Sequence, residues 1–173
     1  MAEQTRSQPV GVSPGGWGPG RLVDLALRFL SIQRPDLGRG TRLFAPALVL
    51  RLAGAVLLAW VGWVHWILYH NEGYSHIPTS GPFFLVDAIA GVVLAIVLLA
   101  WPRPVVGLAS AGFTGGTILA LVISLTVGLF GFKEHIAANY VVLALVVESV
   151  AVVILLAWTV LAAWTVPGRR SPG

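Results

Sequence analysis

Residues 48–70, LVLRLAGAVLLAWVGWVHWILYH, decide the fold of this chain. A helix needs about 20 apolar residues to cross the ~30 Å hydrocarbon core of a bilayer, and this run is longer than that. Two ionisable residues interrupt it, Arg51 near one end and His65 near the other. They share one helical face, whose members recur at intervals of three and four: Arg51, Ala55, Leu58, Gly62, His65 and Tyr69. We expect this face to point into a bundle of helices.

The composition of the whole chain also indicates a membrane protein. Of its 173 residues 57% are apolar and only 10% are charged, whereas soluble domains are about 25% charged. The mean hydropathy is +0.85. The chain has no cysteine, which excludes disulfides, thiol catalysis and cysteine-ligated metal clusters. A pI near 10.4 would suit nucleic acid, but membrane topology explains the positions of the basic residues better, so we expect no nucleic-acid partner.

Four long apolar segments predict four membrane spans. Lipid offers backbone groups no hydrogen-bond partner, so each span is expected to be helical. The predicted fold is an all-α integral membrane four-helix bundle over residues 44–166. The segments run from Ala45 to His70, from Pro82 to Trp101, from Pro104 to Phe132 and from Ala138 to Thr165.

Polar segments flank the predicted bundle. Residues 1–20 are rich in Gly, Pro, Ser and Gln and predict a disordered tail. Residues 21–43 predict an amphipathic interfacial helix, RLVDLALRFLSIQ, followed by a basic linker. The alternatives for this helix are packing beneath the bundle or fraying in water. Residues 167–173 form a short tail.

The basic residues predict the orientation of the spans. They cluster before the first span, in the second loop and in the tail, and only Lys133 lies on the other side. By the positive-inside bias both termini are cytoplasmic, in a multi-pass protein of the cytoplasmic (inner) membrane. The residues that carry this prediction are Arg6, Arg21, Arg28, Arg34, Arg39, Arg42, Arg51, Arg103, Arg169 and Arg170.

The third span repeats a small residue at every fourth position. Such ridges let helix backbones approach closely in lipid. We therefore predict a helix-packing ridge against another helix of this chain, another membrane protein or a second copy in a homo-oligomer. The alternative is that glycine is simply common in membrane helices. The ridge residues are Gly112, Gly116, Ala120, Ser124 and Gly128.

Three ionisable residues at compatible depths predict an intramembrane polar cluster. We expect His65 and Asp87 to lie about 7 Å below the outer helix ends and Glu148 to lie ~12 to 15 Å below them. A buried acid costs roughly 2.5 to 3.5 kcal/mol on insertion scales unless it is protonated or paired. Structural roles remain open for each: a hydrogen-bonded packing histidine, an Asp87 bound by hydroxyls of the third span, and a protonated structural Glu148.

Arg51 has two interpretations. It either extends to the inner headgroups or anchors an anionic headgroup or a carboxylate.

The predicted outer loops contain metal-binding residue types without a metal motif. Zinc or copper would suit them, but their spacing matches no known site, so we expect a solvated polar surface. One histidine within a span does not make a bis-histidine haem site, so no cofactor is expected. No catalytic motif is present, which favours a non-enzymatic role. The loop residues are His70, Glu72, His76, Glu134 and His135.

Short motifs resemble known membrane proteins. The sequence Arg51-Leu-Ala-Gly54, followed by Gly62 and His65 and then by Asp87 and Gly91, is similar to the start of DoxX-like four-span proteins. The stretches GYSHIPTSGPFFL and VGLFGFKEH resemble a group of small four-span actinobacterial membrane proteins. The resemblance covers residues 45–165 and implies a four-span fold. Some DoxX-like proteins are subunits of membrane oxidoreductase complexes.

The expected function is that of a non-enzymatic accessory or scaffold subunit that contacts the lipid bilayer and a redox or envelope complex. The alternatives are a small proton-coupled transporter that uses Glu148 and Asp87, and a membrane redox subunit.

Overall fold

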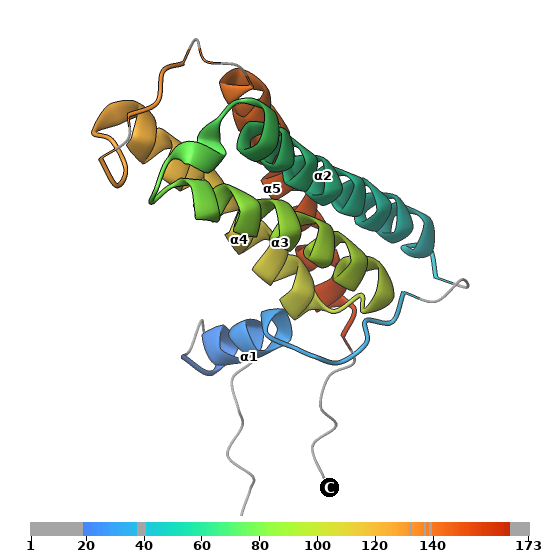
Figure 1. The fold of residues 1–173 in the computed structure, drawn as a ribbon. Coiled ribbons are helices and arrows are strands. Elements are labelled where there is room, and N and C mark those ends of the chain that lie inside the picture. The colour runs from blue at the N-terminus through green and yellow to red at the C-terminus, as the bar shows by residue number, and fades with distance from the viewer. Residues whose placement is uncertain (1–18, 38–40, 132, 137, 139, 167–173) are drawn as a thin grey trace, which may run out of the picture.

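The computed structural model describes residues 19–37, 41–131, 133–136, 138 and 140–166. Helices joined by turns and loops make up this part of the chain, and it contains no strand. The predicted disordered tail and the last seven residues lie almost entirely outside this range. The helices are α1 (Pro19–Phe29), α2 (Phe44–Asn71), the short 3-10 helix η1 (Tyr74–His76), α3 (Gly81–Ala100), α4 (Pro104–Thr126) and α5 (Val141–Trp164) (Figure 1).

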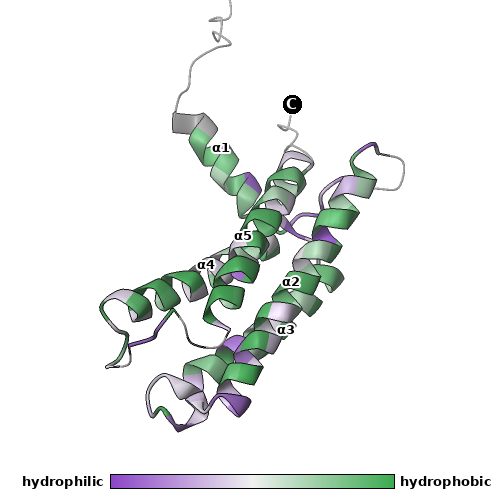
Figure 2. Cartoon of the chain, turned by 90° about the horizontal axis from the view of Figure 1, so that it is seen from above, coloured by the Kyte–Doolittle hydropathy of each residue, from purple (hydrophilic) through white to green (hydrophobic). Residues whose placement is uncertain are grey.

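Helices α2 to α5 are each long and apolar enough to cross a membrane. Apolar residues predominate along these helices, and most of the strongly polar residues lie near the helix ends (Figure 2). The predicted all-α architecture with four spans is therefore confirmed. It is that of a multi-pass integral membrane protein.

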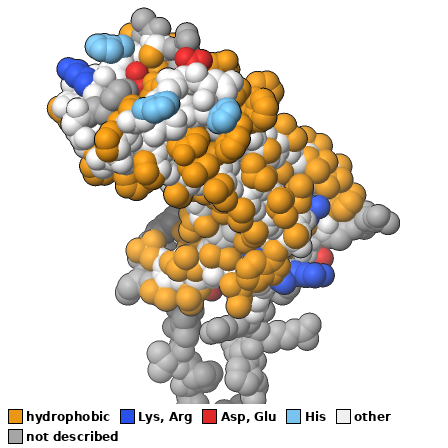
Figure 3. All heavy atoms as spheres, in the orientation of Figure 1, with side chains coloured by type: hydrophobic (Ala, Val, Ile, Leu, Met, Phe, Trp, Pro, Cys, Tyr) orange, Lys and Arg blue, Asp and Glu red, His pale blue; other side chains and the backbone are white. Residues whose placement is uncertain are grey.

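The two ends of the four long helices differ in charge. One end, here called the histidine end, carries His70, His76 and His135 near η1 (Figure 3). The other, here called the arginine end, carries Arg42, Arg103 and α1. The assignment of the arginine end to the cytoplasm stays a prediction, because it depends on the positive-inside bias alone.

Helix α2 packs along both α3 and α5, and α4 packs along α5. α2 and α3 approach backbone to backbone at a glycine pair: a Cβ atom added to Gly91 would lie 2.8 Å from the nitrogen of Gly62. Helices α3 and α4 contact each other over only a short stretch. The ring of helix contacts is thus closed on three sides and incomplete on the fourth.

The divergence of α4 from α2 and α3 begins near the arginine end. A Cβ atom at Gly107 would lie 2.6 Å from the ring of Trp158 on α5, so the two helices are in tight contact there. Towards the histidine end α4 leans away from α2 and α3 (Figure 2). An apolar core fills the closed part, with Leu58, Leu98 and Leu155 fully buried around Trp158.

Two helices end at least four residues earlier than the sequence predicts. α4 ends at Thr126 and not at Phe132, because Gly128, Phe130 and Gly131 have φ angles of 89°, 52° and 81°, which a right-handed helix does not allow. The first helix ends at Phe29, before the turn that precedes Pro35, and packs against α4 and α5. Its location at a membrane interface stays a prediction.

Candidate intramembrane polar site

His65 is held in a fixed orientation by its own helix. It is buried on α2, and its Nδ1 donates a hydrogen bond to the carbonyl oxygen of Val61 at 2.9 Å. The proton on Nδ1 is therefore engaged, and Nε2 is the ring atom that can accept or donate a further proton. The ring of Phe84 on α3 lies against the imidazole, with 5.8 Å between ring centroids.

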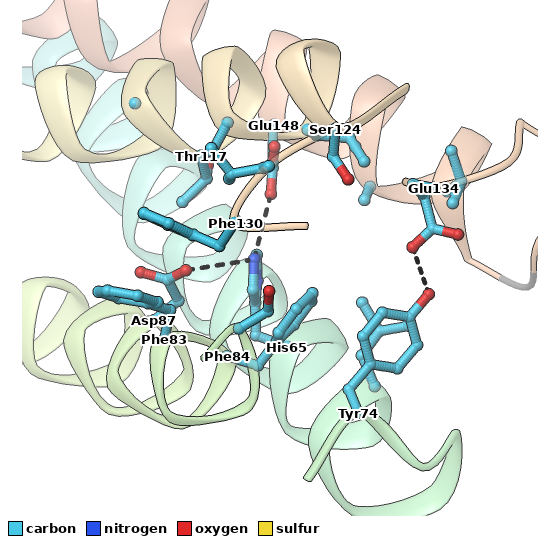
Figure 4. A pocket seen from close by; sticks show the side chains of 18 of the residues that line it. His65, Tyr74, Phe83, Phe84, Asp87, Thr117, Ser124, Phe130, Glu134 and Glu148 are labelled. Carbon is cyan, nitrogen blue, oxygen red and sulfur yellow. Dashed lines mark hydrogen bonds and ion pairs between the residues drawn. The ribbon is translucent and has the colours of Figure 1, made fainter. Parts of the chain in front are cut away.

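Two carboxyl groups converge on the Nε2 atom of His65 from different helices (Figure 4). The distance from Nε2 is 3.9 Å to Oδ2 of Asp87 on α3 and 3.8 Å to Oε1 of Glu148 on α5. Both lie within ion-pair range but exceed the length of a direct hydrogen bond. The structure thus brings together the three residues that the sequence singled out as one polar cluster.

The two acids have different surroundings. The side chain of Asp87 is 29% exposed, whereas that of Glu148 is 3% exposed. The Oε2 atom of Glu148 is buried without a hydrogen-bond partner among the described residues. Thr117 of α4 lies beside Glu148, but its hydroxyl donates to the carbonyl oxygen of Thr114 at 2.7 Å. Among the hydroxyls of the third span, that of Thr126 donates to carbonyl oxygens of its own helix.

A cavity of about 400 Å³ adjoins the three ionisable residues, between α3 and α4 towards the histidine end. Its wall includes Phe83 and Phe84 from α3, Phe113 from α4 and Phe130 from the segment that follows α4. Phe83 and Phe130 stack with 5.4 Å between their ring centroids, across the interval between α3 and α4. The cavity is therefore largely apolar and aromatic, with ionisable groups at a few defined places.

The charged groups of the cavity wall are almost all acidic. Asp87, Glu134 and Glu148 line it together with His65, and no Lys or Arg is present among its described lining residues. A cavity whose apolar walls carry several ionised carboxyl groups, and no group of fixed positive charge, attracts a positively charged ligand.

Tyr74 and Glu134 close the cavity at the histidine end. The Tyr74 hydroxyl donates a hydrogen bond to Oε2 of Glu134, whose Oε1 accepts from the backbone nitrogen of His135 at 3.0 Å. Burial raises the pKa of the Tyr74 phenol above its ordinary range, and the hydrogen bond and negative charge of Glu134 raise it further. The phenol therefore keeps its proton and stays a donor, and it joins η1 to the segment after α4.

The cavity is closed towards the arginine end. Ala151 and Leu155 follow Glu148 on α5 by one and two turns, and both are fully buried in the apolar core. The three ionisable side chains thus stand at the inner limit of the cavity between α3 and α4.

Four residues of the predicted small-residue ridge line this cavity, and two of its glycines face open space among the described residues. A Cβ atom added to Gly112 or Gly116 would meet nothing within 4 Å. Both residues, with Ala120 and Ser124, belong to the cavity wall, while Gly128 lies beyond the end of α4. The packing of this face against another protein or a second copy stays a prediction.

The remaining sequence candidates lie apart from the cluster. Arg51 lies near the arginine end, beside a second cavity. At the histidine end, His70 stacks on Trp66 with 5.5 Å between ring centroids, and His76 contacts the carbonyl oxygen of Gly73. Among the described residues no three His, Asp or Glu side chains are grouped so that they could hold a metal ion.

The contact between Tyr74 and Glu134 was not foreseen from the sequence. The two residues are 60 positions apart, and Glu134 was considered only as a loop carboxylate. Its burial depends on the left-handed turn after α4, which the glycines at 128 and 131 indicate but do not locate in space.

Comparisons with protein-family models, with curated proteins and with solved structures found no match for this chain. The DoxX-like resemblance and the resemblance to actinobacterial four-span proteins therefore stay predictions.

Proposed function

We propose that this membrane protein binds a small organic cation with an apolar body in the cavity between α3 and α4, and that binding is linked to release of a proton from His65, Asp87 and Glu148. The observation that carries the proposal is the position of one imidazole nitrogen within 4 Å of two carboxyl groups at the wall of an aromatic cavity. This is the proton-coupled transporter considered from the sequence, with a class of ligand added.

The wall chemistry supports a cationic ligand. Carboxyl groups favour positive charge, and aromatic faces attract a cation within about 6 Å of the ring centroid. Phe83, Phe84 and Phe130 supply such faces next to Asp87. A ligand with an apolar body would enter from the bilayer between α3 and α4, because these two helices contact each other over only a short stretch.

The geometry of His65 supports coupling to a proton. Its Nε2 is shared between two acids, so a proton on this atom neutralises the same carboxyl groups that a cationic ligand would neutralise. The proton and the cation therefore compete for one site. The closed core beyond Glu148 means that transport across the membrane needs a second conformation.

Calorimetry with benzyltrimethylammonium, a permanent aryl cation, tests this proposal on the purified full chain. We expect binding with proton release, seen as a dependence of the measured heat on the ionisation enthalpy of the buffer. Glu148→Gln and Asp87→Asn should each weaken binding about tenfold or more, which is at least 1.4 kcal/mol. Glu72→Gln is the matched control, because Glu72 is an exposed acid at the same end and does not line the cavity.

The neutral isostere of the probe, neopentylbenzene, provides the second control. It has the same shape without the charge and should not compete. Equal competition by neopentylbenzene, or equal affinity of the three variants and the wild type, would contradict the proposal.

The accessory role expected from the sequence is a second candidate. It is favoured by the open face of α4, where Gly112, Gly115 and Gly116 have no neighbour within 4 Å of an added Cβ atom. Such a face suits a helix of another membrane protein or of a second copy. Crosslinking in native membranes distinguishes the two, since the accessory role requires a partner at α4 and the carrier role does not.

A further inference from the structure

A second cavity lies at the arginine end, far along α2 from the polar cluster. Its volume is about 420 Å³. It lies between the segment after α1, the first turns of α2, the end of α3 and the ring of Trp158 on α5. Two arginines line it, Arg34 from the segment after α1 and Arg51 from α2, and none of its described lining residues is acidic.

Neither arginine has a partner of opposite charge among the described residues. No ion pair joins Arg34 or Arg51 to a described acid, and Asp24 of α1 is bound to Arg28 at 3.0 Å. The Nε atom of Arg51 is buried without a hydrogen-bond partner in the part of the chain that the structure describes. Arg51 is half-buried and Arg34 is exposed, so the cavity presents two cationic side chains and no acid among its described lining residues.

The backbone holds both sides of this cavity in place. The nitrogen of Asp36 donates a hydrogen bond to the carbonyl oxygen of Thr165 at 2.8 Å, which fixes the segment after α1 to the end of α5. Leu37 of the same segment packs against the main core. Arg51 stands seven residues into α2, about 10 Å along the helix from Phe44.

We infer that this cavity binds a phosphate group between the guanidinium groups of Arg34 and Arg51. The planar fork of arginine matches phosphate oxygens with paired hydrogen bonds. Leu99 both lines the cavity and is 43% exposed on α3, so the site borders the lipid-facing surface. The phosphate of an anionic phospholipid and free inorganic phosphate share this chemistry. In either case the anion joins the segment after α1 to α2.

The competing explanation is that Arg51 simply extends to whichever headgroups are near. In that case neither the lipid class nor Arg34 matters. The two explanations therefore differ in selectivity and in the role of a residue outside the spans.

Native mass spectrometry of the purified full chain tests the lipid source. Dioleoylphosphatidylglycerol and dioleoylphosphatidylcholine are added in equal amounts, and the wild type should retain the anionic lipid preferentially. Retention should fall about tenfold in Arg34→Gln and in Arg51→Gln, and stay unchanged in Arg42→Gln. Arg42 is an exposed arginine at the same end that does not line the cavity.

A second arm tests the free anion. Inorganic phosphate is compared with sodium chloride of equal ionic strength by the midpoint of thermal unfolding. A rise in midpoint with phosphate that Arg34→Gln removes, without selective lipid retention, supports the same site with a soluble ligand. Arg51→Lys keeps the charge without the fork and should bind more weakly than the wild type.

Two results would overturn the inference. One is equal retention of both lipids together with no effect of phosphate. The other is an equal loss in Arg42→Gln and Arg34→Gln, which would indicate general attraction by surface charge. Because Arg34 is exposed outside the spans, its substitution should leave the fold intact even where Arg51→Gln does not.

Discussion

Two pairs of glycines have opposite surroundings in this molecule. Gly62 and Gly91 bring α2 and α3 into backbone contact, and a Cβ atom on either would lie within 2.8 Å of the other helix. Gly112 and Gly116 on α4 face open space, and a Cβ atom there would meet nothing within 4 Å. The first pair closes a helix interface and the second leaves room for a cavity. Glycine thus allows close helix packing between α2 and α3, and it leaves space for the cavity beside α4.

The comparison teaches that spacing alone does not distinguish the two uses. Four-residue intervals of small residues place them on one face of a helix, but the neighbouring helix decides whether that face is filled. The tight contact at Gly107 holds the first turns of α4, at the arginine end, against α5. The rest of α4 diverges from α3. The cavity is a consequence of that divergence.

The largest effect is expected for Gly91→Ala, which places a methyl group against the backbone of α2. Overpacked sites lose about 1 to 3 kcal/mol, and here the clashing atoms are backbone atoms that cannot rotate away, so a loss of about 3 kcal/mol is expected. The midpoint of thermal unfolding in detergent measures it. Gly112→Ala is the matched control on the open face, and its midpoint should not fall. Similar losses in both variants would remove the distinction between the two pairs.

Much of the fold could be predicted from the sequence, because length and hydropathy are sufficient to identify four spans. The meeting of His65, Asp87 and Glu148 could also be anticipated, since a charge within lipid needs a partner at its own depth. The outline of the cavity could not. It depends on the tilt of α4 and on the left-handed residues after Thr126, which are tertiary features.

A smaller effect is expected for Tyr74→Phe. This substitution removes the hydrogen bond to Glu134 that closes the cavity between α3 and α4 at the histidine end. Glu134 would then be buried with one oxygen lacking its donor, which costs about 2 kcal/mol near neutral pH. The variant also changes the response to alkali. Because the pKa of Tyr74 is raised in the folded state, its contribution is complete below pH ~10 and is lost as the pH rises above that value.

Unfolding midpoints measured from pH 7 to strongly alkaline solution check this second prediction. The wild type should lose stability above pH ~10, and Tyr74→Phe should lose less over the same interval although it starts lower. Tyr69→Phe on α2 is a suitable control, because Tyr69 contacts the ring of Trp66 and does not line the cavity. Parallel curves for wild type and Tyr74→Phe would show that this phenol does not close the cavity.

The smallest effect, and one of opposite sign, is expected for Gly116→Ala. Alanine is favoured over glycine in a helix by about 0.8 to 1 kcal/mol. Because the space beside Gly116 is open, the added methyl group meets no steric clash that would offset this stabilisation. The unfolding midpoint should therefore rise slightly, where Gly91→Ala lowers it strongly. Gly116→Leu extends the test, because its larger side chain should reduce binding of benzyltrimethylammonium without loss of stability. A fall in the midpoint for Gly116→Ala would instead indicate that a helix of another protein or of a second copy covers α4, as in the accessory role. The cavity wall formed by α4 would then be part of an interface between proteins.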